Sequence, residues 1–223
     1  CWNCWVTNRA AGGCGRPAWL GRPTTHGKKR PVVQFNYSKS WEMDRTNPLR
    51  FCMVTSFYPP YHFGGDGMFV YRLSEALAEA GHKVDVVHSV DAFKIQKDAI
   101  PAEGFTHHPN VTLHPLESTH PSLSLLSAHQ LGSPGLYGPQ RKEIFAGERY
   151  DVIHYHNVSL VGGPGVMRLG NALKLYTSHE YWLVCPTHVL FRYDGVACTQ
   201  KRCLRCTLHY HRPPQLWRNT GLL

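Results

Sequence analysis

The sequence predicts an α/β fold, a Rossmann-like parallel sheet with helices on both faces, and three observations support this prediction. Short apolar runs recur along the chain, and helical or glycine-bearing stretches separate them. Strands that are buried on both faces of a parallel sheet have this character. Residues 49–89 also follow the order of a β-α-β unit, namely an apolar run, a loop, a helical segment and a second apolar run. Finally, polar residues directly follow several of the runs.

The β-α-β unit begins with the apolar strand Phe51–Thr55, and the rest of the chain is organised around it. Pro59 and Pro60 cannot continue a strand, so the chain has to leave the sheet there. The unit spans residues 49–89 and contains one loop, one helix and a second strand.

A glycine-bearing loop connects the first strand to the helix. Gly64, Gly65 and Gly67 allow a positive φ and the close approach of a ligand. Asp66 is expected to be the N-cap of the helix that follows. Backbone N–H groups at such a helix N-terminus favour a phosphate or another anion.

The helix after this loop is amphipathic. Its apolar residues recur at spacings of three and four and are expected to form one buried face: Phe69, Val70, Leu73, Ala76, Leu77 and Ala80. Gly81 is expected to end the helix, because a left-handed residue is favoured directly after a helix. The next strand is predicted at Val84–Val87.

The remaining segments alternate between strands and short helical or irregular stretches, which favours a parallel sheet covered on both faces. The predictions, in chain order, are an irregular surface connection at 91–109, an edge strand at 111–116, a partly helical flap outside the core at 118–139, a short helix at 139–147, a strand at 150–155, a short helix at 165–169 and a strand at 172–177.

The positive charge of the chain is concentrated near its amino terminus. The formal net charge is +9, and residues 1–50 contain nine Lys or Arg against two acidic residues. Residues 1–48 lack a regular apolar pattern and are predicted to be a disordered basic tail, with Met43 as the expected natural start. The domain is predicted at residues 49–223. Its near-neutral charge argues against a nucleic-acid-binding domain.

The expected location is the cytoplasm, because the chain shows no secretory signal and no apolar run long enough to span a membrane. The exposed segment 118–138 is a candidate for gripping an acceptor or for peripheral contact with a membrane surface.

Three groups of polar residues fall at the carboxyl ends of predicted strands, where open α/β sheets bind ligands. They are the Gly64/Gly65 loop, His154 with His156, and His179 with Glu180. The first histidine pair is consistent with metal ligands, but a hydrogen-bonded pair at the strand end is favoured. His179 and Glu180 could act as an acid–base pair. A single hydrogen bond from His179 to substrate is preferred, because adjacent strand residues point in opposite directions.

Three stretches of the chain resemble the amino-terminal half of family 4 glycosyltransferases with the GT-B architecture. They read FYPPYHFGGDGMFVYRLSEALAEAGHKVDVV, YDVIHYHN and YTSHEYWLVCP. The resemblance covers roughly residues 49–223. It implies one Rossmann-like half of a two-domain enzyme that transfers a sugar from a nucleotide-sugar to a glycan or lipid acceptor, with retention of anomeric configuration and without a catalytic metal.

The resemblance also implies roles for individual residues. His179 matches the family histidine that contacts the donor sugar, and it is the catalytic candidate. Gly64 and Gly65 match the loop that approaches the donor diphosphate, and His156 is a looser match to a second pocket histidine. Glu180 is a further substrate-binding candidate. Because the carboxy-terminal, nucleotide-binding domain is expected to be missing, the chain alone is expected to be inactive. The alternative function is a non-catalytic sugar- or nucleotide-binding module.

Four cysteines cluster in the segment 185–206 with the spacing C-x12-C-x4-C-x2-C: Cys185, Cys198, Cys203 and Cys206. The two-residue spacing of the last pair lets both sulfurs reach one ion. A structural zinc site is predicted, with an iron–sulfur cluster less favoured. A disulfide and free thiols are the alternatives, and zinc-dependent nucleic-acid binding is the least favoured function, since no ββα pattern surrounds the cysteines.

Overall fold

The structure is a computed structural model that describes residues 47–95, 100–133, 135–147, 150–200, 202–211, 215 and 217–218. The basic tail predicted for residues 1–48 therefore lies outside the described residues, apart from its last two.

Five parallel strands form one sheet in the order β3-β2-β1-β4-β5. Their bounds are Arg50–Val54 for β1, Lys83–Ser89 for β2, Val111–Leu116 for β3, Val152–Tyr155 for β4 and Leu173–Tyr176 for β5. Each strand lies within two or three residues of its predicted position, and β3 is an edge strand as predicted. The Rossmann-like α/β class is confirmed.

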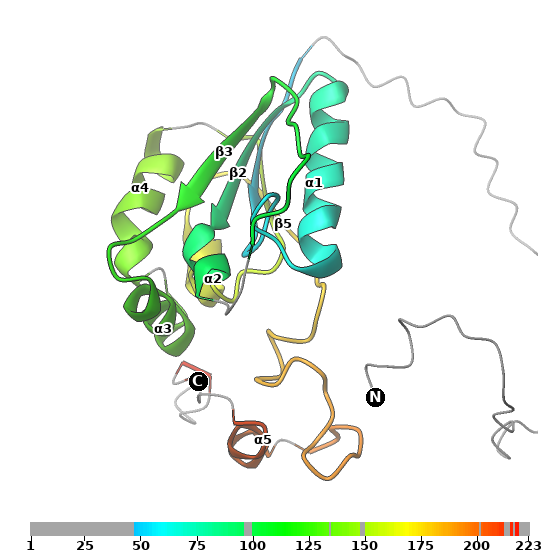
Figure 1. The fold of residues 1–223 in the computed structure, drawn as a ribbon, viewed down its shortest axis with the longest axis vertical. Coiled ribbons are helices and arrows are strands. Elements are labelled where there is room, and N and C mark those ends of the chain that lie inside the picture. Colours follow the sequence, from blue (N-terminus) through cyan, green and yellow to red (C-terminus); the bar gives the residue numbers. More distant parts are fainter. Residues whose placement is uncertain are drawn as a thin grey trace, which may run out of the picture. The chain divides into compact units, whose positions relative to one another are not determined.

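Helices cover both faces of this sheet, and Figure 1 shows α1 and α4 on opposite sides of it. The helical elements are α1 (Gly64–Glu79), α2 (Val90–Lys94), α3 (Pro121–Leu131), α4 (Gly138–Gly147) and α5 (Cys203–His209), with 3-10 turns η2 (Gly135–Tyr137) and η3 (Gly163–Arg168).

Two apolar cores follow from the alternation of side chains along the strands. On the α1 side, Met53 of β1 and Val86 of β2 pack with Val70 of the helix. On the other side, Cys52 and Val54 join the larger core, which also receives Leu125, Tyr137 and Ile153 among others. Because β1 is central and contributes to both cores, it anchors the two layers of helices to one sheet.

Two connections are more ordered than predicted. Residues 90–94 form α2, whose Val90, Asp91, Ala92 and Phe93 are buried, so the expectation of an irregular surface segment starting at 91 was wrong there. Ser89 caps this helix by accepting a hydrogen bond from the Ala92 N–H at 3.1 Å. The predicted flap also contributes to the core, since Leu125 of α3 is buried while its neighbours Leu123 and Leu126 are exposed.

The amino-terminal end of α1 differs from its prediction. The helix begins at Gly64, and its N-cap is Phe63, which makes no side-chain capping bond. The assignment of Asp66 as N-cap was therefore wrong. Asp66 lies in the first turn instead, where its carboxylate accepts a hydrogen bond from the Gly67 N–H at 2.8 Å. At the other end, Gly81 follows the helix with φ +93°, which confirms its predicted left-handed conformation.

The three glycines of the loop serve different purposes. Gly64 has φ +70°, whereas Gly65 and Gly67 do not adopt a positive φ. Gly67 is needed for space, because a Cβ there would lie 2.9 Å from His62 Cβ and 3.2 Å from the Phe57 carbonyl oxygen. A Cβ on Gly65 would meet nothing within 4 Å.

Gly67→Ala is therefore expected to lower the free energy of unfolding by about 1–3 kcal/mol, because backbone atoms have to move to admit the methyl group. Gly65→Ala is the matched control and should leave stability unchanged or raise it by up to about 1 kcal/mol, since alanine favours a helix. Urea unfolding of the two variants measures the difference. Equal stability of the two would show that the Gly67 contact is not tight.

Candidate functional site

Three histidines meet at the carboxyl ends of β4 and β5. His154 lies in β4 and its ring centroid is 4.1 Å from that of His156, just beyond the strand. The Nδ1 atom of His156 lies 3.1 Å from Nε2 of His179, which follows β5. His154 is held from its other side by Thr177, with Nε2 and Oγ1 2.8 Å apart. Parallel pairing of β4 with β5 brings these residues together, although more than 20 positions separate them in the chain.

Helix α1 reaches this cluster through Phe69. Its ring centroid lies 5.3 Å from His179 and 5.9 Å from His156, in edge-on orientations. The sequence pattern placed Phe69 on the buried face of the helix, but 46% of its surface is exposed. Because Phe69 lies about one turn after Gly64 and Gly65, the glycine loop and the histidine cluster occupy the same edge of the sheet.

Burial keeps His156 neutral. The side chain is fully buried, and burial together with the neighbouring His154 and His179 lowers the pKa of His156 from its ordinary value to about 3. Burial and His179 also lower the pKa of His154. At neutral pH His154 and His156 therefore offer uncharged imidazoles, each of which has one N–H donor and one acceptor nitrogen.

Asn157 connects the histidine cluster to the glycine loop. Its carbonyl oxygen accepts a hydrogen bond from the Ser56 hydroxyl at 2.9 Å, directly after β1. Its side-chain amide lies 3.4 Å from the Asp66 carboxylate in α1, and its Oδ1 accepts from the Ser159 hydroxyl at 2.7 Å. These bonds fix the spacing between the end of β4 and the first turn of α1. In the sequence, Asn157 could have been identified as a site residue from its position directly after His156.

Glu180 is held by a residue of the cysteine-bearing segment. The Oε2 atom of Glu180 lies 2.5 Å from Nδ1 of His188, and both side chains are partly exposed. The sequence did not identify His188, because the seven residues between it and Glu180 have to turn back on themselves for this contact to form.

Two of the predicted site residues keep a buried atom without a hydrogen-bond partner among the described residues, namely Nε2 of His156 and Oε1 of Glu180. Leaving such an atom unpaired costs about 1–3 kcal/mol. A ligand hydroxyl group can donate to a carboxylate oxygen and can either donate to or accept from an imidazole nitrogen. The two atoms are therefore suited to hydroxyl groups.

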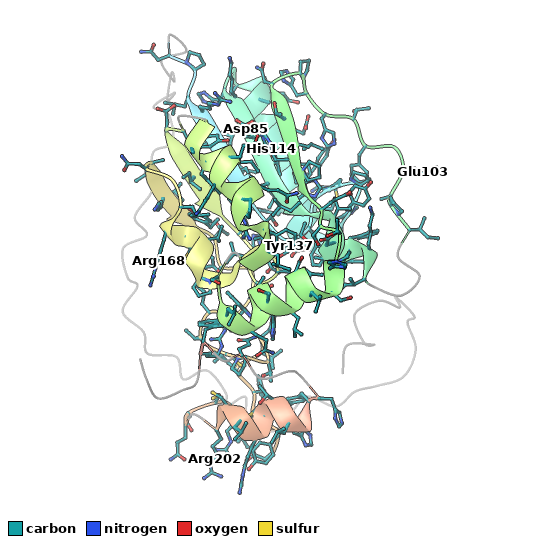
Figure 2. The ribbon with its side chains drawn as sticks, turned by 90° about the vertical axis from the view of Figure 1, so that its left-hand side faces the viewer. Asp85, Glu103, His114, Tyr137, Arg168 and Arg202 are labelled. Carbon is teal, nitrogen blue, oxygen red and sulfur yellow. The ribbon has the colours of Figure 1, made fainter. Side chains whose placement is uncertain are left out.

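A separate hollow of about 460 Å³ lies between β3 and α4 and does not include the predicted site residues. His114 lines it, and Nε2 of His114 lies 2.8 Å from the Asp85 carboxylate, a pair that Figure 2 shows side by side. Burial opposes ionisation of Asp85, but hydrogen bonds from His114 and Arg50 hold the pKa of this carboxyl below its ordinary value. The pair ties edge strand β3 to β2.

The predicted metal ligands are reduced thiols. Cys185 and Cys206 are buried, Cys198 and Cys203 are partly exposed, and none of the described cysteines forms a disulfide. Within the described ranges, no group of three or more His, Cys, Asp or Glu side chains is already placed to hold a metal ion.

Comparison with known proteins identifies the family. The model of Glycosyltransferase Family 4 matches residues 63–220, which is well over half of the chain. The chain belongs to this family. No curated protein matches the sequence.

The match to Glycosyltransferase Family 4 supports a function in sugar transfer, with a sugar donor and an acceptor as substrates in general. It begins at Phe63, the N-cap of α1, and covers the helix, the histidine cluster and the cysteine-bearing segment. No helix in the described ranges has the length and apolar character needed to cross a membrane.

Proposed function

We propose that this family 4 domain provides the acceptor-side half of a retaining glycosyltransferase site, which moves a sugar from a nucleotide-sugar to a glycan or lipid acceptor. The observation that carries the proposal is the contact of His156, His179 and Phe69 at the carboxyl edge of the sheet. Open α/β sheets bind ligands at this edge.

The charges around this edge favour a sugar ring. Asp66 and Glu180 flank the cluster, one bonded to Asn157 and the other following His179. Carboxylates accept hydrogen bonds from hydroxyl groups, while they repel phosphate at close range. Neutral His156 adds a further hydrogen-bonding nitrogen without adding positive charge. This set of groups binds a carbohydrate better than it binds a diphosphate.

In the proposed complex His179 hydrogen-bonds the transferred sugar and is the catalytic residue. His156 positions His179 through the 3.1 Å contact between their rings. Charge that develops on the leaving diphosphate would be stabilised partly by the N-terminus of α1, where Gly64 and Gly65 expose the backbone. That contribution is about 0.3–1 kcal/mol at a surface helix end, so most of the stabilisation has to come from a nucleotide-binding domain.

The experiment is ligand-observed NMR and calorimetry with a panel of nucleoside diphosphate sugars and short glycans. His179→Ala is expected to weaken binding of the best ligand at least about tenfold, because one hydrogen bond to a buried site is worth about 1.4 kcal/mol. His108→Ala is the matched control, since His108 precedes β3 at the opposite edge of the sheet. Equal losses in both variants would contradict the proposed site.

Turnover distinguishes the proposal from a binding module without catalysis. In the proposed mechanism the isolated 223-residue chain binds the sugar but gives no measurable transfer, and addition of a nucleotide-binding domain of the same family restores it. Transfer by the isolated chain would show that the described domain carries the complete site.

A further inference from the structure

We propose that Cys185, Cys198, Cys203 and Cys206 bind one Zn²⁺ ion as a tetrahedral four-thiolate site that closes the segment 185–206. This inference is independent of the proposed sugar site. Three different local structures each contribute cysteine ligands to it: a tight turn, a hairpin and helix α5.

The turn around Cys185 is held by short-range hydrogen bonds. The Thr187 hydroxyl lies 3.2 Å from the Cys185 sulfur, and the Cys185 N–H donates to the Tyr181 carbonyl at 2.7 Å. His188 and Leu190 adopt φ values of +70° and +54°, which side chains rarely tolerate. Such strain persists only where the surrounding structure demands it. Here the strained residues belong to the turn that carries Cys185, whose carbonyl oxygen accepts a hydrogen bond from the His188 N–H at 3.1 Å.

A short hairpin carries Cys198 back toward this turn. Phe191 pairs with Ala197, and the Cys198 N–H donates to the Leu190 carbonyl at 2.8 Å. Cys198 is therefore bonded through its backbone to Leu190, a residue of the turn that follows Cys185. Cys185 and Cys198 therefore lie on adjoining backbone segments.

Helix α5 contributes the other pair. Cys203 and Cys206 are three residues apart, which places them on one side of the helix. The hairpin contacts this helix, because the Tyr210 hydroxyl donates to the Arg192 carbonyl at 3.2 Å and Arg205 donates to the Tyr193 hydroxyl at 3.3 Å. Cys203 lies near enough to Cys185, Cys198 and Cys206 to interact electrostatically with all three.

The surrounding charge suits a site that would carry two net negative charges, four thiolates with one Zn²⁺ ion. The Arg218 guanidinium interacts with Cys185 and Cys203, and it is fixed by the Leu183 carbonyl at 2.7 Å. Zinc sites of this type couple ligand assembly to local folding. The ion would draw the sulfurs into the coordination distance, since no three ligands are preplaced among the described residues.

The segment needs such a cross-link because its apolar side chains are mostly exposed. The large exposed members are Val189, Phe191, Val196 and Leu204. A segment without its own apolar core usually depends on a metal or a disulfide, and its cysteines are free. Closure of the segment would also hold His188 against Glu180 at the edge of the sugar site.

The test is the metal content of the full chain, expressed with zinc available and purified under reducing conditions. About one zinc ion per chain is expected. Replacement of zinc by Co²⁺ should give sulfur-to-cobalt charge-transfer absorption and the d–d bands of tetrahedral geometry. Cys203→Ser and Cys206→Ser should each weaken metal binding at least about tenfold, with circular dichroism confirming that the sheet remains folded.

Two controls separate this site from the other cysteines. Cys52→Ala removes a thiol that is buried in β1, and a variant with serine at Cys1, Cys4 and Cys14 removes those of the tail. Both are expected to keep the zinc ion. Absence of zinc together with absence of the cobalt spectrum would overturn the proposal, as would bound iron with cluster absorption, or loss of zinc in the tail variant alone.

Discussion

Replacement of Trp182 by alanine is expected to lower the free energy of unfolding by about 3–5 kcal/mol. Only 1% of Trp182 is exposed, and it belongs to the larger core beneath the sheet. The guanidinium of Arg218 lies over its ring at 5.4 Å and also donates to its carbonyl oxygen. Truncation to alanine would leave a cavity and remove the surface on which Arg218 and Trp217 pack.

The neighbouring Tyr181→Ala is the matched control for this prediction. Tyr181 is 55% exposed, and a surface substitution of this kind usually changes stability by less than about 0.5 kcal/mol. Urea unfolding followed by circular dichroism compares the two variants. Trp182→Phe should fall between them and keeps the effect measurable if the alanine variant does not fold. A loss below about 1 kcal/mol in Trp182→Ala would contradict the packing described for this residue.

The second large expected effect is a loss of stability in mild acid caused by buried histidines. The pKa of His156 is lowered to about 3 and that of His88 to about 4, in both cases mainly by burial. In the unfolded chain a histidine titrates near its ordinary value of about 6.5. Between these values the unfolded state binds more protons, so stability is complete above about pH 6.5 and falls as the pH decreases.

Each buried histidine is expected to contribute up to roughly 3 kcal/mol to the loss between about pH 6.5 and pH 4. Urea unfolding at a series of pH values measures it. His156→Gln should flatten the dependence, because glutamine does not titrate, while the exposed His120→Gln should leave the slope unchanged. A slope that is the same in wild type and His156→Gln would show that His156 is not held neutral by the fold.

Local sequence patterns were sufficient for the positions of the strands along the chain and for the course of the main helix. Apolar runs located β1, β2 and β4, because strands covered on both faces have no room for polar side chains. Gly81 marked the end of α1 for a stereochemical reason, since its φ of +93° is open to glycine. Local patterns failed where a segment is ordered by contacts with residues distant in the sequence. Helix α2 is an example, because it is buried by tertiary packing and its own short pattern did not predict a helix.

For the candidate site, the sequence by itself determined which polar residues follow the strands, because parallel strands bring their carboxyl ends to one edge. Only the tertiary structure decided which of them meet: His156 with His179, Phe69 over both rings, and His188 with Glu180. The physical reason is that these contacts depend on the order of strands in the sheet and on the path of the segment after β5. Neither is encoded in the spacing of residues along the chain.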